Sequence, residues 1–334
     1  MSIVEISDIT GLGAPLKKLF TVISKGVGKI TKPYLIRKTA DAKAYEIKTI
    51  SEAMNEAYSE LQQIEYDNNK IKISSLDESQ IQDEISLNER QLNRNQFIEQ
   101  KRQLNVESIT QHAIEDMETE ETISNEEVDD DWITRFFDYA KDVSNEEMQK
   151  IWGKILSGQV KNPKSFSFRT LDALRNLSKE EAKIFAKVAQ YAILDHRDAF
   201  LYKGKKNQEL LKKFNIQYSD ITLLQELDLL HTGDFVGLNM KKSERTTIET
   251  YQFGSKVVVV KRKPEAPSNS LSIFLFTSVG KELLTLIKNE SEFDYLLAFA
   301  KDARTAASSV QHADFLKREG NQVTFKEPLI DIPE

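Results

Sequence analysis

The feature that most constrains the fold is a long stretch without chain breakers. After Pro33 neither glycine nor proline occurs until Gly153. The stretch is rich in Glu, Gln, Lys, Ala and Leu, which lose little side-chain freedom in a helix, and no proline interrupts the backbone hydrogen bonds. The sequence therefore predicts long helices over most of this region.

Within this stretch, apolar residues recur three and four positions apart in two runs, as on one face of a helix. The first run comprises Ile47, Ile50, Met54, Ala57, Leu61 and Ile64, and the second comprises Ile81, Ile85, Leu92, Val106, Ile109 and Ala113. Polar residues at 67–69 and 74–75 predict a turn between them. We predict a long helical hairpin or coiled coil over 51–128, which serves either as bundle core or as an oligomerising surface.

Shorter helices with clear start signals are predicted for 129–200. Ser144 and Ser178 are each followed three residues later by a glutamate, Glu147 and Glu181. This Ser-x-x-Glu pattern is a capping box, in which the hydroxyl and the carboxylate each accept a backbone N–H. The segment is therefore predicted to be a compact helical domain.

The last segment, 201–334, has a mixed pattern. Two short helices are predicted at 206–214 and 219–230, followed by strands at 248–253, 256–263 and 271–276 and then a helix up to residue 287. A polar stretch at 264–269 reads as the tip of a hairpin between the last two strands. This order is typical of a winged helix. The predicted fold class is mainly α: a long helical hairpin, a compact helical domain and a C-terminal α+β winged-helix-like domain.

The sequence offers little catalytic chemistry. The chain has no cysteine, which excludes thiol nucleophiles, disulfides and Cys-ligated metals. The histidines are isolated from any metal-ligand spacing and are His112, His196, His231 and His312. Glycine-rich phosphate loops and the hydrolase elbow are absent. We expect no enzyme activity, no cofactor, no metal and no small-molecule substrate. One alternative is a metal-dependent nuclease-like site at Asp41, Glu46 and Lys48.

A basic segment occupies residues 1–50. Nine basic residues lie between Pro15 and Lys48, against two acidic ones, and apolar residues three and four apart share one helical face. The segment can pack as the first helix of its own domain, lie on an anionic membrane surface or partner, or contact nucleic-acid phosphates. Gly26 and Gly28 indicate a helix break or a close packing contact there. The predicted membrane or partner contacts are Leu16, Leu19, Phe20, Ile23, Lys17, Lys18, Lys25, Lys29, Arg37 and Lys38.

An acidic stretch follows near the middle of the chain. Ten acidic residues and no lysine or arginine lie between Ala113 and Asp131. Their spacing does not match a calcium-binding loop. The stretch is either a solvated linker or, through Asp129, Asp130 and Asp131, an acidic docking surface for a basic segment.

A second basic group lies in the predicted winged helix, where it could contact phosphate. It comprises Lys241, Lys242, Lys261, Arg262 and Lys263. The predicted recognition helix instead carries Asp220, Glu226 and Asp228 and no basic residue, so the DNA backbone would repel it. A protein-binding winged helix is therefore favoured over a nucleic-acid reader.

No targeting signal is predicted. Glu5 and Asp8 stand where a signal peptide would be basic, and no apolar run approaches the roughly 18 residues that cross a bilayer. The expected location is the cytoplasm, with peripheral attachment to the inner membrane as a variant.

Two blocks of sequence resemble a known family. The first block contains Ser24-Lys25-Gly26-Val27-Gly28, Ile36-Arg37-Lys38 and Ala40-Asp41-Ala42-Lys43-Ala44-Tyr45-Glu46, and the second contains Glu147-Met148-Gln149, Leu156-Ser157-Gly158 and Pro163-Lys164-Ser165-Phe166-Ser167. Over about residues 10 to 200 the chain resembles a bacterial family catalogued as domain of unknown function 2806. It departs from the family where Lys164 replaces Gly and Gln159 replaces Glu. The resemblance implies no known activity and hints at accessory or defence proteins of bacteria.

These observations together predict a non-enzymatic interaction or regulatory protein. It would act through self-assembly, or through a protein or membrane-surface partner, in a process such as phage defence. The alternative is a nucleic-acid-binding winged-helix regulator.

Overall fold

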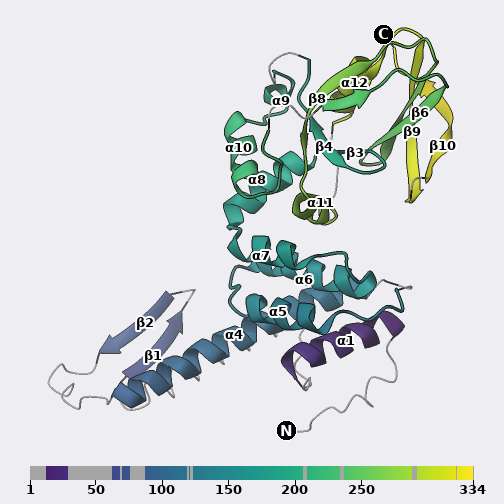
Figure 1. Cartoon of the computed structure of the whole chain (residues 1–334). Coiled ribbons are helices and arrows are strands. Elements are labelled where there is room, and N and C mark those ends of the chain that lie inside the picture. The colour runs from purple at the N-terminus through teal and green to yellow at the C-terminus, as the bar shows by residue number, and fades with distance from the viewer. Residues whose placement is uncertain are drawn as a thin grey trace. The chain divides into compact units, whose positions relative to one another are not determined.

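The computed structural model describes residues 13–28, 62–67, 70–75, 87–118, 120, 123–205, 209–233, 237–287, 292–320 and 322–333. The chain divides into two compact units, an N-terminal unit (Met1–Leu171) and a C-terminal unit (Asp172–Glu334). Figure 1 shows the helices of the first unit and the sheet of the second. Each unit is described by itself.

The N-terminal unit is built from helices. They are α1 (Ala14–Val27), α4 (Leu87–Met117), α5 (Asp130–Ala140), α6 (Glu146–Lys161) and the start of α7 (Phe168–Asn176). Trp132, Phe136 and Trp152 fill the centre, with ring centroids 5.1 Å apart for Trp132 and Phe136 and 5.3 Å apart for Phe136 and Trp152. All three side chains are buried.

Helices α4 and α6 run parallel and pack closely (Figure 1). The Gln149 Nε2 donates to Asn105 Oδ1 over 3.2 Å at one end of the contact. The Ser157 Oγ donates to Asp116 Oδ2 over 2.7 Å at the other end. Because residue numbers rise together along both helices, the two helices point the same way, and α5 returns the chain between them.

Helix α1 completes the core of this unit. Leu19, Phe20 and Ile23 are 0%, 3% and 0% exposed, and α1 contacts α4, α5 and α6. Gly26 lies directly against the ring of Phe137, with no room for a Cβ. Of the two interpretations of Gly26, a helix break or close packing, the structure shows close packing.

The predicted helical hairpin is wrong at its centre. Two antiparallel strands, β1 (Gln62–Asp67) and β2 (Lys70–Ser75), pair there, with Ile64 opposite Ile73 and Tyr66 opposite Ile71. The physical reason is the period of the pattern, because apolar and polar residues alternate here with period two, as a strand requires. The second predicted helix exists as α4 from Leu87 onward, whereas Ile81 and Ile85 lie outside the described residues. Most of the first, including Ile47 to Leu61, lies outside the described residues.

The C-terminal unit contains an antiparallel sheet. Its strands are β3 (Ile193–Leu194), β4 (Ala199–Tyr202), β5 (Gly237–Met240), β6 (Thr247–Phe253), β7 (Lys256–Arg262), β8 (Asn269–Leu275), β9 (Ser308–Glu319) and β10 (Gln322–Asp331). Among the described residues these eight strands follow the order β10-β9-β7-β6-β3-β4-β8-β5. The unit's helices are α8 (Lys179–Ala189), α9 (Glu209–Lys213), α10 (Tyr218–Glu226), α11 (Ser278–Leu284) and α12 (Phe293–Ala303).

The sheet curves around α12, which contacts β7, β8 and β9. The ring of Phe299 packs 5.8 Å from Phe200 and 4.9 Å from Tyr251, centroid to centroid. The Tyr295 hydroxyl accepts from the Tyr202 N–H over 2.7 Å and donates to the Tyr202 carbonyl over 2.8 Å. The core of this unit is therefore an aromatic layer between α12 and the sheet.

The mainly α class and the winged-helix-like domain are both wrong. The predicted strands exist as β6, β7 and β8, but β7 pairs with β6 and β9, whereas β8 pairs with β4 and β5. Residues 264–269 are thus no hairpin tip. The tight turn is instead Gly254-Ser255 between β6 and β7, where Gly254 has a φ of 55° that glycine adopts without strain.

Both predicted helix starts are present, with one shift of position. At α8 the capping box is complete, since the Ser178 N–H donates to Glu181 Oε2 over 2.7 Å and the Glu181 N–H donates to Ser178 Oγ over 3.3 Å. At α6 the cap is Asn145 rather than Ser144, because the Met148 N–H donates to Asn145 Oδ1 over 3.1 Å.

Candidate interaction surfaces

The apolar face of the basic helix α1 packs within the N-terminal unit. Leu19, Phe20 and Ile23 lie in the core, while Leu16 is half-buried and Lys17 is exposed. The predicted contacts Lys29, Arg37 and Lys38 lie outside the described residues. The three core residues therefore have no surface to offer a membrane or a partner.

Two lysines of α1 form polar contacts with other residues of the N-terminal unit. Lys18 Nζ donates to the carbonyls of Ser124 and Val160 over 2.9 Å and 3.0 Å, and burial lowers its pKa. Lys25 Nζ lies 3.0 Å from Asp130 Oδ1, and this hydrogen bond raises the pKa of Lys25. These lysines anchor α1 to the bundle.

The predicted acidic docking surface receives a basic residue of the same chain. Lys25 pairs with Asp130 and lies 3.6 Å from Glu127. Asp129 is the N-cap of α5, where its Oδ1 accepts from the Trp132 N–H over 2.8 Å. Asp131 is exposed in the first turn of α5, where negative charge suits the helix dipole. The structure thus places Lys25 of α1 on Asp130.

A stripe on α4 lies away from the face that packs on α6. We call it the α4 outer stripe. It comprises Arg90, Phe97, Leu104, Gln111 and Glu118, each seven residues from the next. Seven residues are nearly two helical turns, so these side chains share one side of the helix and its end. Phe97 is 46% exposed. Sequence reasoning missed this stripe, because it followed the apolar run on the opposite side.

Basic residues prevail in the first half of α4 and acidic residues in its second half. The first half carries Arg90, Arg94, Lys101 and Arg102 against Glu89 and Glu99, whereas the second half carries Glu107, Glu115 and Asp116 and is followed by Glu118 and Glu120. A helix dipole favours acidic residues at the start and basic residues at the end, each by about 0.3 to 1 kcal/mol. This effect is confined to the first and last turn, so in α4 it concerns Glu89 at the start and Glu115 and Asp116 near the end. It does not account for the basic residues Arg94, Lys101 and Arg102.

Part of the acidic end is neutralised within the bundle. Lys161 Nζ lies 2.9 Å from both Asp116 Oδ2 and Glu120 Oε2. Burial alone would raise the pKa of Asp116, but hydrogen bonds from Ser157 and Lys161 outweigh it and lower that pKa. Glu115 and Glu118 remain exposed.

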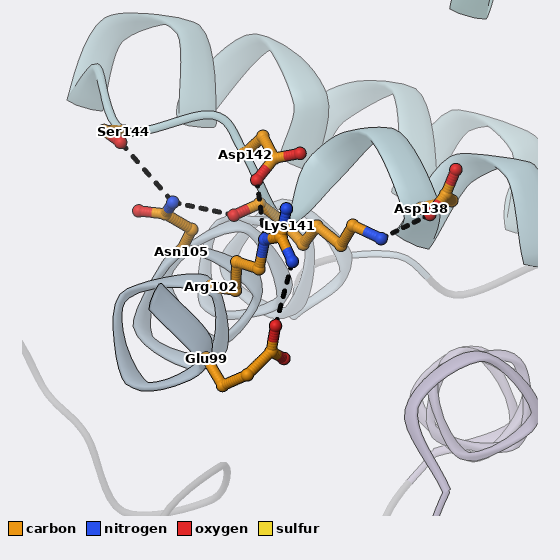
Figure 2. A network of polar contacts seen from close by, with 7 residues as sticks. All are labelled: Glu99, Arg102, Asn105, Asp138, Lys141, Asp142 and Ser144. Carbon is orange, nitrogen blue, oxygen red and sulfur yellow. Dashed lines mark hydrogen bonds and ion pairs between the residues drawn. The ribbon is translucent and has the colours of Figure 1, made fainter. Parts of the chain in front are cut away.

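A polar network fixes the point where α4 leaves the bundle (Figure 2). Arg102 donates from Nε to Asp142 Oδ1 and from Nη1 to Glu99 Oε1, each over 2.8 Å. Asn105 Nδ2 donates to the Lys141 carbonyl over 2.8 Å, and Lys141 pairs with Asp138. The network ties the loop after α5 to the middle of α4.

A hollow of about 240 Å³ lies beside this network. It is lined by Phe97, Ile98, Lys101, Arg102, Asn105, Lys141, Asp142 and Ser144. Its lining combines apolar side chains with charges of both signs. The hollow shares Phe97 with the α4 outer stripe, so a partner on that stripe would also contact the rim of the hollow.

The predicted phosphate contacts lie close together in the C-terminal unit. Lys241, Lys242, Lys261 and Lys263 are exposed, whereas Arg262 is 2% exposed. Arg262 Nη1 donates to the Lys241 carbonyl over 3.0 Å, and Nη2 donates to the Pro267 carbonyl. Arg262 therefore holds two loops at the end of β7 rather than offering its guanidinium to a ligand.

Other predicted features find no site in the described part of the chain. No group of three His, Asp or Glu side chains there could hold a metal ion. Asp41, Glu46 and Lys48, the nuclease-like alternative, lie outside the described residues. None of the described helices has the length and apolar character that crossing a membrane requires.

The chain thus combines a helical unit with an antiparallel sheet wrapped around a helix, and each unit presents a charged surface. It belongs to the family described as Protein of unknown function (DUF2806), whose model matches residues 89–300. This confirms the family that the sequence resembles. The match covers the second block and extends into the C-terminal unit, but it does not include the first block at residues 24–46. Comparison with curated proteins and with solved structures gave no match.

Proposed function

We propose that this protein acts by interaction rather than by catalysis, and that two copies associate through the α4 outer stripe. The observation that carries the proposal is the charge order of α4, basic in its first half and acidic in its second. This order is self-complementary in an antiparallel pair, because a second α4 places its acidic half against the basic half of the first.

In an antiparallel pair of α4 helices, the α4 outer stripe of one copy faces the α4 outer stripe of the other. With Leu104 on the two-fold axis, each Leu104 meets its copy and Phe97 meets Gln111 of the other copy. Arg90 then meets Glu118 of the other copy, and this contact occurs twice because the interface is isologous. The two helix dipoles also oppose each other, which is favourable.

The exposed half of α4 supports the same assembly. Leu87, Leu92 and Phe97 are 71%, 57% and 46% exposed, although large apolar side chains gain free energy when removed from water. Most of the stability of a helix in a protein comes from packing of its apolar side chains rather than from helix propensity. Pairing would cover part of this surface.

The oligomeric state and its disruption test the proposal. We expect the purified protein to be a dimer by light scattering coupled to size exclusion, and the double variant Phe97→Asp, Leu104→Asp to be a monomer, because two buried charges would face each other on the axis. The matched control, Leu316→Asp with Ile330→Asp, changes two exposed apolar residues of the C-terminal unit and should remain a dimer. A monomeric wild-type protein would contradict the proposal.

Charge exchange tests the orientation of the two helices. Arg90→Glu or Glu118→Arg alone should weaken the dimer by about tenfold, since each creates two like-charge contacts. The double exchange should restore it. Because the chain has no cysteine, Leu104→Cys should oxidise to a linked dimer, whereas Arg90→Cys should link only when mixed with Glu118→Cys. Self-linking of Arg90→Cys would show a parallel pair instead.

A further inference from the structure

The exposed cations at the end of β7 form a compact group. We call it the β7 basic patch, and it comprises Lys241, Lys242, Arg245, Lys261 and Lys263, all exposed. The register pairs Thr247 with Arg262, which brings the loop before β6 to the end of β7. Arg262 bonds the Lys241 carbonyl, which brings in the other end of the same loop.

Two of these lysines flank the buried Arg262 at the end of β7. Lys261 precedes Arg262 in the strand, and Lys263 follows the last residue of the strand. Both lysines are exposed, whereas Arg262 is buried.

The patch has an excess of positive charge. Its five cations stand near two exposed acidic residues, Glu244 and Glu265. Within the described part of the chain, none of the five forms an ion pair. Cations grouped in this way, without carboxylate partners, produce a local positive potential in a chain whose net charge is −7.

We infer that the β7 basic patch binds the phosphate backbone of nucleic acid. Besides its cations, the patch carries hydroxyl groups on Ser243 and the exposed Thr246, and such groups commonly donate to phosphate oxygens. A membrane surface is less suited, because Lys and Arg alone contribute only about 1 kcal/mol each there and stable binding also uses exposed apolar side chains. Ile248 is the one large apolar residue exposed in this part of the described sheet. The inference is independent of the pairing of α4.

Fluorescence anisotropy of a short labelled DNA duplex tests the inference. The variant with four substitutions, Lys241→Glu, Lys242→Glu, Lys261→Glu and Lys263→Glu, should bind the duplex about 100-fold more weakly. The slope of its log affinity against log salt concentration should be smaller in magnitude by about three to four. The matched control, with Lys154, Lys183, Lys212 and Lys213 changed to Glu, carries the same net charge and should retain wild-type affinity. Equal loss in both variants would overturn the inference.

Two further measurements keep the test decisive. If the four Glu substitutions disturb folding, the corresponding Lys→Gln variant should still bind DNA about tenfold more weakly. Vesicles containing phosphatidylserine present anionic headgroups instead of a nucleic-acid backbone. Binding to these vesicles through the same lysines, without binding to the duplex, would overturn the inference. The α4 variant Phe97→Asp, Leu104→Asp should retain its contacts with DNA, which separates this test from that of the dimer.

Discussion

The free energy of unfolding of the C-terminal unit is expected to fall by about 4 kcal/mol per pH unit above about pH 10. The main cause is the three most deeply buried tyrosines of this unit, Tyr202, Tyr251 and Tyr295, which are 0%, 2% and 0% exposed. Burial raises the pKa of all three. The carboxylates of Asp302 and Glu249 further raise the pKa of Tyr202 and Tyr251, respectively.

The direction follows from proton binding in the two states. An unfolded tyrosine ionises with a pKa of about 10, whereas these three keep their protons in the folded state well above that pH. Their contribution is therefore complete below about pH 10 and is lost as pH rises from there toward the folded pKa values. Each tyrosine contributes about 1.4 kcal/mol to the loss per pH unit.

Urea unfolding at a series of pH values measures this loss. The fluorescence of both tryptophans, Trp132 and Trp152, reports on the N-terminal unit. Far-ultraviolet circular dichroism reports on both units, so the part of its change that does not follow the fluorescence belongs to the C-terminal unit. Tyr251→Phe should reduce the pH slope by about one third, while the control Tyr218→Phe, at a side chain that is 62% exposed, should leave it unchanged. Ionisation of every tyrosine near pH 10 in the folded protein would contradict the prediction.

Local patterns in the sequence predicted many elements correctly. The runs that became β6, β7 and β8 carry alternating or continuous apolar residues, and Ser178 with Glu181 marked the start of α8. Such signals depend on neighbours in the chain, so one sequence is enough to read them. The β1–β2 pair was missed because a turn between two expected helices was given priority over the period-two pattern on both sides of it.

The pairing of the strands could not be predicted in the same way. β4 is only four residues long, and its burial on both faces gives no alternation. β9 and β10 carry many charged residues, such as Lys317 and Lys326, and read as a polar tail. Without these strands, β6, β7 and β8 had no partners except one another, and a winged helix was the natural inference.

The candidate surfaces likewise combine features that local sequence patterns reveal with features that depend on contacts between distant residues. The basic residues of the β7 basic patch were recognised from the sequence, but the burial of Arg262 depends on carbonyls at Lys241 and Pro267. The contact of Lys25 with Asp130 joins residues far apart in the chain. The α4 outer stripe, in contrast, carries a signal that sequence alone offers, a seven-residue spacing with opposite charges at its two ends.

Gly153→Val is expected to lower the free energy of unfolding of the N-terminal unit by about 3 kcal/mol. A Cβ at this position would lie 2.6 Å from the Cβ of His112, 3.0 Å from the Ile109 carbonyl oxygen and 3.1 Å from the Ala113 nitrogen. Two of these atoms belong to the backbone of α4, so no side-chain rotation relieves the clash. The first glycine after Pro33 is thus the residue that lets α4 and α6 approach.

Urea unfolding followed by tryptophan fluorescence checks this, since Trp152 lies next to the substituted position. Lys154→Val on the exposed side of the same helix is the control, and it should cost only about 0.5 kcal/mol through helix propensity. The circular-dichroism transition of the C-terminal unit should not change in either variant. Gly153→Ala separates the steric clash with α4 from helix propensity. Alanine favours a helix by about 1 kcal/mol over glycine, so only the clash can make this variant less stable. A stabilised Gly153→Ala protein would show that α4 and α6 have room for a side chain between them.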